Sequence, residues 1–287
     1  MATLLCANNL VGDATVTGSP CLPTAPLSLV QTWPPSLRAV VPAVGTEAAP
    51  ITVSAAWPEA RLVSYVGLFD LNLRQSSLAS LRIYGDSARS YLIHSEVRRV
   101  LPPLHEPQYY LFGDDNLFLG GIPEQEYMSV PTSVHFVFDP LAAVVVDIAL
   151  WGETYTQAGD NDSQTEIGLI WVSGSLEVAC WAGTKHRRDP QGQSASVPGV
   201  GDAIDPGLPR RGATLRLDDL DLDDAGAIAS FICFVGDTQP YVYIPDHRDP
   251  AVTWRWGGLY RLSSVTESTT TERGRVALDL QLSEATI

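Results

Sequence analysis

Two of the seven tryptophans stand in the arrangement most suggestive of ligand binding. The stretch Trp254-Arg255-Trp256-Gly257-Gly258 places two indoles two residues apart. Residues i and i+2 of a strand lie on the same side, so both rings would face one way and offer a sugar a stacking platform. Packing of both rings against a helix is the more conservative interpretation of the same spacing. We therefore take Trp254 and Trp256 as the candidate glycan-stacking residues and keep core packing as the alternative.

The densest group of potential metal ligands is the acidic run Asp218–Asp224. If Asp219 were the first position of a calcium-binding hand, the sixth would be Asp224, where glycine is required, and the twelfth Ser230, where glutamate is required. The run is therefore better explained as the solvated start of a helix. The acidic loop 159–163 fits either a calcium loop or an ordinary turn. We predict no metal site.

The sequence contains no recognisable catalytic motif. It lacks a G-x-S-x-G elbow, an H-E-x-x-H helix and a phosphate-cradling loop. Paired carboxylates for glycoside hydrolysis depend on a geometry that a sequence does not show, and 33 acidic residues make such pairs uninformative. We predict a protein that is not an enzyme and that carries no cofactor. The histidines lack metal-ligand spacing and are His94, His105, His135, His186 and His247.

The charge balance argues against nucleic-acid binding. The formal net charge is −15, and Lys185 is the only lysine. The one basic cluster is Lys185–Arg188, which Asp189-Pro190 follows directly. Phosphate recognition needs many clustered cations, so a solvated loop or an ion-pairing patch is the expected role of this cluster.

Length and cysteine content set broad limits. A chain of 287 residues, 45% of them apolar, suits one large β domain or two smaller ones. Cys6 and Cys21 could bridge an N-terminal loop, although a reduced chain made in a cytoplasm is the simpler expectation. We expect no signal peptide and no membrane-spanning segment, because no apolar run has the required length and flanks.

The strongest structural signal lies between Arg61 and Asp86. Residues 61–73 are apolar on both strand parities, as in a strand covered on both faces. Residues 81–86 alternate, as in a half-exposed strand. We predict that this central pair forms the core of an antiparallel β-sandwich of the jelly-roll or galactose-binding-like kind. Further predicted strands are Ile51–Trp57, Ser133–Phe138, Ala142–Trp151 and Glu166–Val172.

The last third of the chain predicts a smaller α+β segment. Apolar residues at helical spacing predict one helix over 222–235, with acids at its start and Gly236 at its end. Residues 183–213 have few apolar anchors and are predicted to be a long exposed excursion. Predicted strands are Tyr241–Ile244 and a terminal pair, Trp254–Val265 with Arg275–Leu282. The predicted domains are 1–175, a sandwich with an N-terminal extension, and 176–287.

Two parts of the chain resemble a known family. Residues 51–175 are similar to the discoidin or galactose-binding-like β-sandwich of tail proteins of tailed bacteriophages, and the C-terminal third has a similar order of elements. The resemblance covers about two thirds of the chain and rests on Val66–Leu73, Leu81–Asp86, Glu166–Val172, Arg211–Leu217, Tyr241–Asp246 and Gly258–Leu262. The excursion 183–213 departs from it by lacking aromatic anchors.

The resemblance implies a structural protein of the virion, in the tail tip or baseplate and of the distal-tail or fibre-attachment kind. Its partners would be other tail or baseplate subunits and copies of itself in a ring or trimer, and it would be made in the host cytoplasm. A host glycan is a further implied partner. A carbohydrate-binding module for host-surface glycans is the alternative function.

Overall fold

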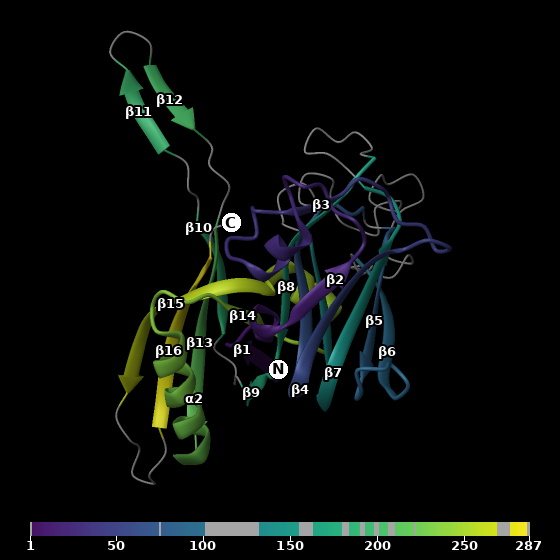
Figure 1. The fold of residues 1–287 in the computed structure, drawn as a ribbon. Helices are drawn as coiled ribbons and strands as arrows, with labels where there is room; N and C mark the ends of the chain where they lie inside the picture. The colour runs from purple at the N-terminus through teal and green to yellow at the C-terminus, as the bar shows by residue number, and fades with distance from the viewer. Residues whose placement is uncertain are drawn as a thin grey trace, which may run out of the picture. The chain divides into compact units, whose positions relative to one another are not determined.

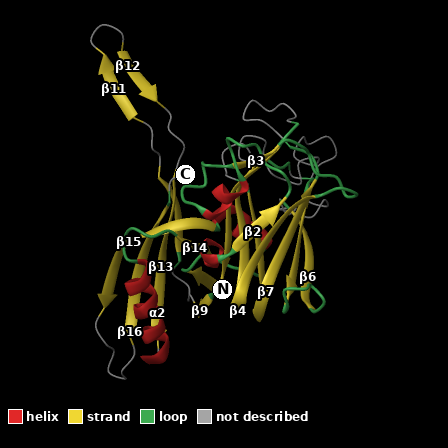
Figure 2. Cartoon of the chain, viewed as in Figure 1, coloured by secondary structure: helices red, strands yellow, loops and turns green. Residues whose placement is uncertain are grey.

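The computed structural model describes residues 2–74, 76–100, 132–154, 163–179, 184–189, 193–197, 201–205, 210–220, 222–268 and 276–285. The chain divides into two compact units. We call Asn8–Ser175 with Asp249–Arg255 the N-terminal unit. Met1–Ala7, Leu176–Arg248 and Trp256–Thr286 form the C-terminal unit. Both units are built mainly from antiparallel strands (Figures 1 and 2), which confirms the predicted fold class.

The N-terminal unit contains one seven-stranded antiparallel sheet. Its order is β3-β8-β4-β7-β5-β6, and β2 pairs with β4 outside this path. Two short 3-10 helices, η1 (Leu10–Asp13) and η2 (Leu27–Gln31), precede β3. The strands are β2 (Thr15–Gly18), β3 (Ala39–Val41), β4 (Ile51–Leu71), β5 (Leu78–Tyr84), β6 (Leu92–Arg99), β7 (Ser133–Trp151) and β8 (Thr165–Ser173).

Two long strands, β4 and β7, organise this sheet. They pair from Ile51↔Leu150 to Phe69↔Ser133, with register shifts near the middle of β4. β2 flanks the first half of β4, and β8 flanks its second half. Two expectations are therefore corrected. The strands predicted as 133–138 and 142–151 are one strand, and the predicted central pair does not pair directly, because β7 lies between β4 and β5.

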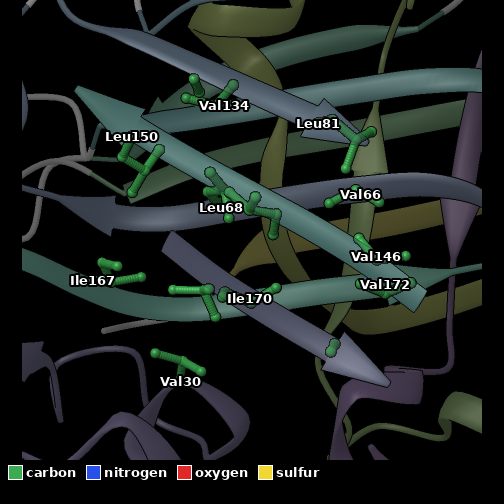
Figure 3. Packing of buried hydrophobic residues seen from close by; sticks show 14 of the residues in the cluster. Val30, Val66, Leu68, Leu81, Val134, Val146, Leu150, Ile167, Ile170 and Val172 are labelled. Atoms are coloured by element: carbon green, nitrogen blue, oxygen red, sulfur yellow. The ribbon is translucent and has the colours of Figure 1, made fainter. Parts of the chain in front are cut away.

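The core of the N-terminal unit is one hydrophobic cluster to which both halves of β4 contribute. Val53 comes from the first half and Leu68 from the second, and β8 adds Ile167 and Ile170. Figure 3 shows side chains of β4, β7 and β8 gathered in this cluster. Full burial of one such side chain contributes about 1.5–3 kcal/mol. Because the bulged strands enclose a single core, the predicted antiparallel sandwich is confirmed.

The C-terminal unit contains a second seven-stranded antiparallel sheet, in the order β10-β13-β16-β15-β14-β1-β9. β1 pairs with β14 and β9, so the first strand of the chain completes a sheet of later strands. As independent domains, the segments 1–175 and 176–287 stay a prediction. The strands are β1 (Ala2–Cys6), β9 (Leu176–Ala179), β10 (Lys185–Asp189), β13 (Arg210–Leu220), β14 (Tyr241–Ile244), β15 (Gly258–Ser268) and β16 (Val276–Glu284).

Helix α2 (Leu222–Val235) covers this second core and confirms the predicted helix. It buries Ile228 and Phe231, and the Phe231 ring meets Tyr241 edge-on at 5.0 Å. Gly236 ends the helix with a φ of +54°, and its N–H donates to the Ile232 carbonyl. Glycine adopts this left-handed conformation without a steric penalty, which explains the stop.

The predicted strand 254–265 begins too early. Residues 250–256 form helix α3 (Pro250–Trp256), and β15 starts at Gly258. The cause is local: the Asp249 carboxylate accepts hydrogen bonds from the N–H groups of Ala251 and Val252, and Pro250 occupies the first helical position.

The predicted excursion 183–213 is also corrected. β10 pairs with β13 at the end of the seven-stranded sheet. Between them, β11 (Gln193–Val197) and β12 (Gly201–Asp205) form a separate two-stranded hairpin. Polar residues at strand spacing had hidden this structure, since an edge strand needs few apolar anchors.

The expectations about Cys6, Cys21 and membrane-spanning segments can be compared with the described residues. No disulfide joins Cys6 to Cys21; Cys6 is buried and Cys21 half-buried, and burial raises the pKa of the Cys21 thiol. None of the helices in the described part of the chain is long and apolar enough to cross a membrane.

Candidate functional site

The two candidate tryptophans do not form a shared platform. They lie in α3, where residues two apart point about 200° apart around the axis. Trp254 is only 2% exposed and packs in the core of the N-terminal unit. Trp256 belongs to the C-terminal unit and is half-buried. Of the pair, only Trp256 therefore has a ring that a ligand could reach.

Two side chains of β10 lie against the Trp256 indole. The His186 ring stacks on it, with centroids 4.8 Å apart and planes inclined by 21°. The Arg188 guanidinium carbon lies over the indole, 5.6 Å from its centroid. His186 and Arg188 are two residues apart in one strand and so project from the same side of it.

Two tyrosines hold this arrangement in place. The Tyr243 hydroxyl lies 3.0 Å from Nε2 of His186, and the Tyr243 ring meets Tyr260 edge-on at 5.2 Å. The Tyr260 hydroxyl donates to the Trp256 carbonyl at 2.8 Å. Contacts therefore run in a closed circuit from Trp256 through His186, Tyr243 and Tyr260 back to Trp256. We call these four residues with Arg188 the Trp256 cluster.

The electrostatics of the Trp256 cluster favour hydrogen bonding over proton transfer. Burial lowers the pKa of His186, so its imidazole is neutral at pH 7 and has one donor and one acceptor nitrogen. Burial raises the pKa of Tyr260 to about 12, so its phenol stays a donor. Arg188 is exposed and charged. The cluster thus presents an aromatic ring beside polar groups whose positions the protein fixes in advance.

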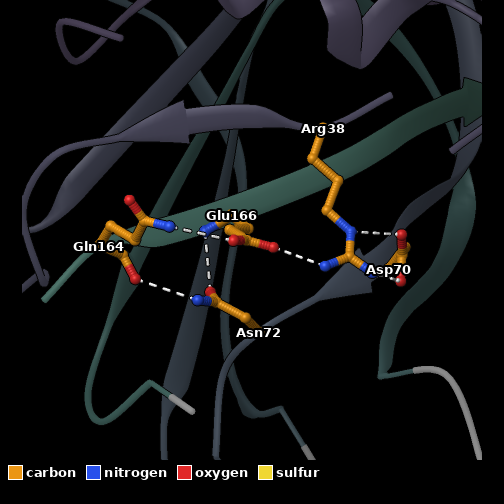
Figure 4. A network of polar contacts seen from close by, with 5 residues as sticks. All are labelled: Arg38, Asp70, Asn72, Gln164 and Glu166. Carbon is orange, nitrogen blue, oxygen red and sulfur yellow. Dashed lines mark hydrogen bonds and ion pairs between the residues drawn. The ribbon is translucent and has the colours of Figure 1, made fainter. Parts of the chain in front are cut away.

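A polar network of five residues in the N-terminal unit surrounds Arg38 (Figure 4). Its guanidinium donates to both oxygens of Asp70, from Nε at 2.7 Å and from Nη2 at 2.9 Å. Nη1 donates to Glu166 at 2.5 Å. Asn72 and Gln164 extend the network: Asn72 Oδ1 accepts from the Glu166 N–H at 2.8 Å, and Gln164 Nε2 donates to Glu166 Oε1 at 3.2 Å.

This network ties together strand ends that are far apart in the sequence. Arg38 precedes β3, Asp70 lies near the end of β4, and Glu166 near the start of β8. Burial alone would lower the pKa of Arg38, but its hydrogen bonds and charge contacts with Asp70 and Glu166 raise it overall. Because the charged groups of the network, Arg38, Asp70 and Glu166, are paired with one another, we assign the network a structural role.

A buried serine–histidine–tyrosine row also lies in the N-terminal unit. Ser133 Oγ lies 3.0 Å from Nε2 of His135, and Nδ1 of His135 lies 2.7 Å from the Tyr65 hydroxyl. A hydroxyl beside an imidazole is the geometry of an activated nucleophile. Ser133 and His135 are each only 7% exposed, however, so mutual satisfaction of buried polar groups explains the row.

The acidic candidates for metal binding are only partly within the described residues. Among these residues, no group of three or more His, Cys, Asp or Glu side chains is placed to hold a metal ion. Residues 159–162 and Asp221 lie outside them. Asp223 and Asp224 lie in the first turn of α2, as predicted for a solvated helix start.

Sequence reasoning named Trp256 but missed its partners. His186 and Arg188 stood in a cluster interpreted as a solvated loop or an ion-pairing patch, and Tyr243 and Tyr260 stood in segments predicted to be strands. A basic residue alternates with aromatic ones only in Trp254-Arg255-Trp256, so nothing in the sequence around His186 or Tyr243 pointed to a shared site.

Comparisons with known proteins give a partial likeness of fold. No protein-family model and no curated protein matches the chain. Among solved structures, the chain is similar to "CpGH89CBM32-4" of Clostridium perfringens in complex with GlcNAc-α-1,4-galactose, at 13% identity and a TM-score of 0.34 over 59% of this chain and 94% of that one. A fucose-binding module of Streptococcus pneumoniae matches at 11% identity and a TM-score of 0.36, over 58% and 95%.

A third match is an F-lectin from striped bass (Morone saxatilis) serum. The identity is 12% and the TM-score 0.36, over 60% of this chain and 49% of that one. Such low identities and TM-scores carry no argument about what this chain binds. The matches give no support to the predicted bacteriophage tail protein. The fold and the site define a mainly antiparallel β protein with a preformed aromatic–cationic cluster.

Proposed function

We propose that this protein is a non-enzymatic carbohydrate-binding protein and that the Trp256 cluster contacts the sugar. The observation that carries the proposal is the half-buried Trp256 indole, held against His186 and beside the exposed Arg188. An indole of this kind can cover the apolar C–H face of a sugar ring. The ring nitrogens of His186 and the guanidinium of Arg188 lie beside the indole, where they can form hydrogen bonds with the hydroxyl groups of the sugar.

The way the cluster is supported also favours binding. A sugar offers many weak hydrogen bonds, so affinity depends on protein groups that lose little freedom when it binds. Tyr243 fixes the His186 ring, and Tyr260 fixes the backbone of Trp256. These supporting hydrogen bonds hold His186 and Trp256 in position before a ligand binds, as an effective binding site requires.

A glycan array followed by calorimetry on the best ligands tests the proposal. We expect binding that Trp256→Leu abolishes and that Trp256→Phe, which keeps an aromatic face, reduces by a smaller factor. Trp151→Leu is the matched control, because Trp151 is also half-buried but lies in the N-terminal unit. An array that stays silent with folded wild-type protein, or equal losses in the Trp256 and Trp151 variants, would show the proposal to be wrong.

A second candidate function, that of a subunit in a larger assembly, rests on the β11–β12 hairpin. Among the described strands, β11 and β12 pair only with each other. An isolated two-stranded hairpin is marginally stable in water, and both of its edges can accept another strand. A partner that covers the hairpin would stabilise it and would also pair its open strand edges.

The assembly hypothesis predicts concentration-dependent association. Sedimentation velocity should show oligomers that disappear when 193–205 are replaced by a short Gly-Ser linker. A wild-type chain that stays monomeric up to the highest soluble concentration would contradict it. The finer form of this hypothesis, a tail-tip or baseplate subunit, is tested by mass spectrometry of purified virions for the chain and its copy number.

A further inference from the structure

We propose that the outward face of the N-terminal unit binds a neutral, linear polysaccharide, with Tyr91 as the stacking residue and Arg82 as a hydrogen-bond donor. This second site shares only the class of ligand with the proposed function, and it uses no residue of the Trp256 cluster. Two features of the described residues carry the proposal: a row of polar side chains that crosses the sheet, and an exposed tyrosine that the neighbouring turn holds in place.

The polar row crosses the neighbouring strands β2, β4, β7, β5 and β6 (Figure 1). Each member is paired in register with the next, in the order Thr17, Ser54, Asp147, Arg82 and Ser95. Residues that are directly paired across strands project from the same face of a sheet. Leu81 and Ile148, which are chain neighbours of two members, pack in the hydrophobic core, so the row faces away from that core.

The spacing of the polar row matches a linear sugar chain. Neighbouring strands lie about 4.8 Å apart, so a row across these strands extends over about 19 Å. One pyranose residue lengthens a sugar chain by a similar step. A chain that crosses the strands would therefore bring successive sugar residues over successive side chains of the row, whose hydroxyl, carboxylate and guanidinium groups supply donors and acceptors for sugar hydroxyls.

Arg89 ties the turn between β5 and β6 to the centre of the polar row. Its Nε donates to Asp147 at 2.8 Å, and its Nη2 donates to the other Asp147 oxygen at 3.2 Å and to the Ser54 hydroxyl at 2.8 Å. Because Arg89 engages both oxygens of Asp147, Arg82, which lies directly opposite Asp147, stays exposed. Within the described part of the chain the Arg82 guanidinium has no ion-pair or hydrogen-bond partner, so its N–H groups can donate to a ligand.

The same turn holds Tyr91 in place. Asp86 accepts hydrogen bonds from the Tyr91 N–H at 2.8 Å and from the Ser90 hydroxyl at 2.6 Å. A Cβ on Gly85 would lie 2.8 Å from Cδ1 of Tyr91, so the tyrosine ring lies directly against the glycine backbone. Tyr91 is nevertheless 65% exposed. Arg89 has a φ of +58°, and costly conformations of this kind in residues other than glycine are concentrated at functional sites.

A neutral sugar suits this surface better than other classes of ligand. The buried centre of a protein–protein interface is mostly apolar, whereas the row is polar throughout. Nucleic acid needs clustered cations, and here Asp86 and Asp147 offset the charges of Arg82 and Arg89. The same balance of charge favours a neutral sugar over an acidic one. A tyrosine ring can cover the apolar C–H face of such a sugar while the row binds its hydroxyl groups.

Affinity electrophoresis on gels that contain soluble neutral glucans, mannans, xylans or galactans tests the proposal, followed by calorimetry with oligosaccharides of increasing length. We expect Tyr91→Ala and Arg82→Gln each to weaken binding at least about tenfold, and Trp256→Leu to leave it unchanged. Tyr91→Phe keeps the ring and should retain most of the affinity. Affinity should rise with chain length up to about four sugar residues, the length that spans the row.

Two control variants match these changes. Leu62→Ala removes another side chain from a residue of the N-terminal unit that is 65% exposed. Arg99→Gln removes the charge of an exposed arginine at the end of β6 that is farther from the turn. We expect both controls to bind as tightly as wild type.

The outcomes separate this second site from the Trp256 cluster. Polysaccharide binding that Trp256→Leu abolishes and Tyr91→Ala leaves unchanged would overturn the second site and leave the proposed function standing. Equal losses in Tyr91→Ala and Leu62→Ala would also overturn it, since the substitutions would then act through the fold. If folded wild-type protein binds none of the polysaccharides on the gels, the second site is wrong, whatever glycan the Trp256 cluster binds on an array.

Discussion

Arg211 and Glu284 form a buried ion pair between β13 and the end of β16. Nη2 of Arg211 lies 2.5 Å from Oε1 of Glu284, and the two side chains are 8% and 14% exposed. The second carboxylate oxygen accepts the Arg211 backbone N–H at 2.8 Å, and Nη1 of Arg211 donates to the Gly257 carbonyl at 3.0 Å. The pair therefore joins strand ends next to the Trp256 cluster.

Replacing Glu284 should cost far more stability than replacing an exposed acid. Glu284→Gln leaves the Arg211 charge buried without a counter-charge, for which we expect a loss of about 3 kcal/mol in the free energy of unfolding. Asp189→Asn breaks the exposed Arg187 pair and should cost less than about 1 kcal/mol. Urea denaturation followed by circular dichroism measures both values. Similar losses would mean that burial does not set the strength of the Glu284 pair.

The Arg38 network should behave as one coupled unit. Arg38→Met leaves the mostly buried Asp70 carboxylate without its cation, and we expect a loss of about 2–3 kcal/mol. Asn is the conservative replacement at Asp70, because the residue there has a φ of +57°, which Asn tolerates. The double variant Arg38→Met with Asp70→Asn should lose less stability than the sum of the losses in the two single variants, by at least about 1 kcal/mol. Additive losses would contradict coupling.

Stability should fall on mild acidification through His186. Burial lowers the pKa of this group in the folded state, so between its ordinary value of about 6.5 and the lower folded value the unfolded chain binds more protons. The contribution of neutral His186 is therefore complete above about pH 6.5 and is lost as the pH falls through the folded pKa. Urea unfolding at pH 7.5 and 5.5 should show a smaller difference for His186→Asn than for wild type. An unchanged difference would count against this assignment.

Two glycines should respond in opposite directions to alanine. Gly226 lies within α2 with no other atom near its absent Cβ, so Gly226→Ala should stabilise the protein by about 0.5–1 kcal/mol through helix propensity. A Cβ on Gly168 would lie 2.5 Å from the Pro35 carbonyl oxygen and 2.7 Å from the Asp70 side chain. Gly168→Ala should therefore cost about 1–3 kcal/mol. Thermal unfolding of both variants gives the signs directly.

Periodicity predicted the elements whose burial pattern is simple. In β16, Leu278, Leu280 and Leu282 are buried and alternate with more exposed residues, and α2 has the predicted bounds. Both elements have one face against a core, and such a pattern is visible in the sequence. The fold class could be predicted for the same reason.

The sequence was less informative where structure depends on distant partners. β10 is almost wholly polar and becomes a strand because β13 offers it a ladder. The contact between His186 and Trp256 joins residues 70 positions apart in the sequence, so no local pattern reveals it. Helix α3 is a different case, because Asp249-Pro250 is a local start signal that could have been recognised.

The position of β1 inside its sheet, between β14 and the edge strand β9, has a consequence for biosynthesis. Nearly all of the N-terminal unit, residues 8–175, leaves the ribosome before any of the later strands that pair with β1. β1 itself is made first, yet its neighbours β9 and β14 are complete only at residues 179 and 244. The five residues Ala2–Cys6 must therefore stay available until β14 has been made, and the sheet of the C-terminal unit can close only after that point.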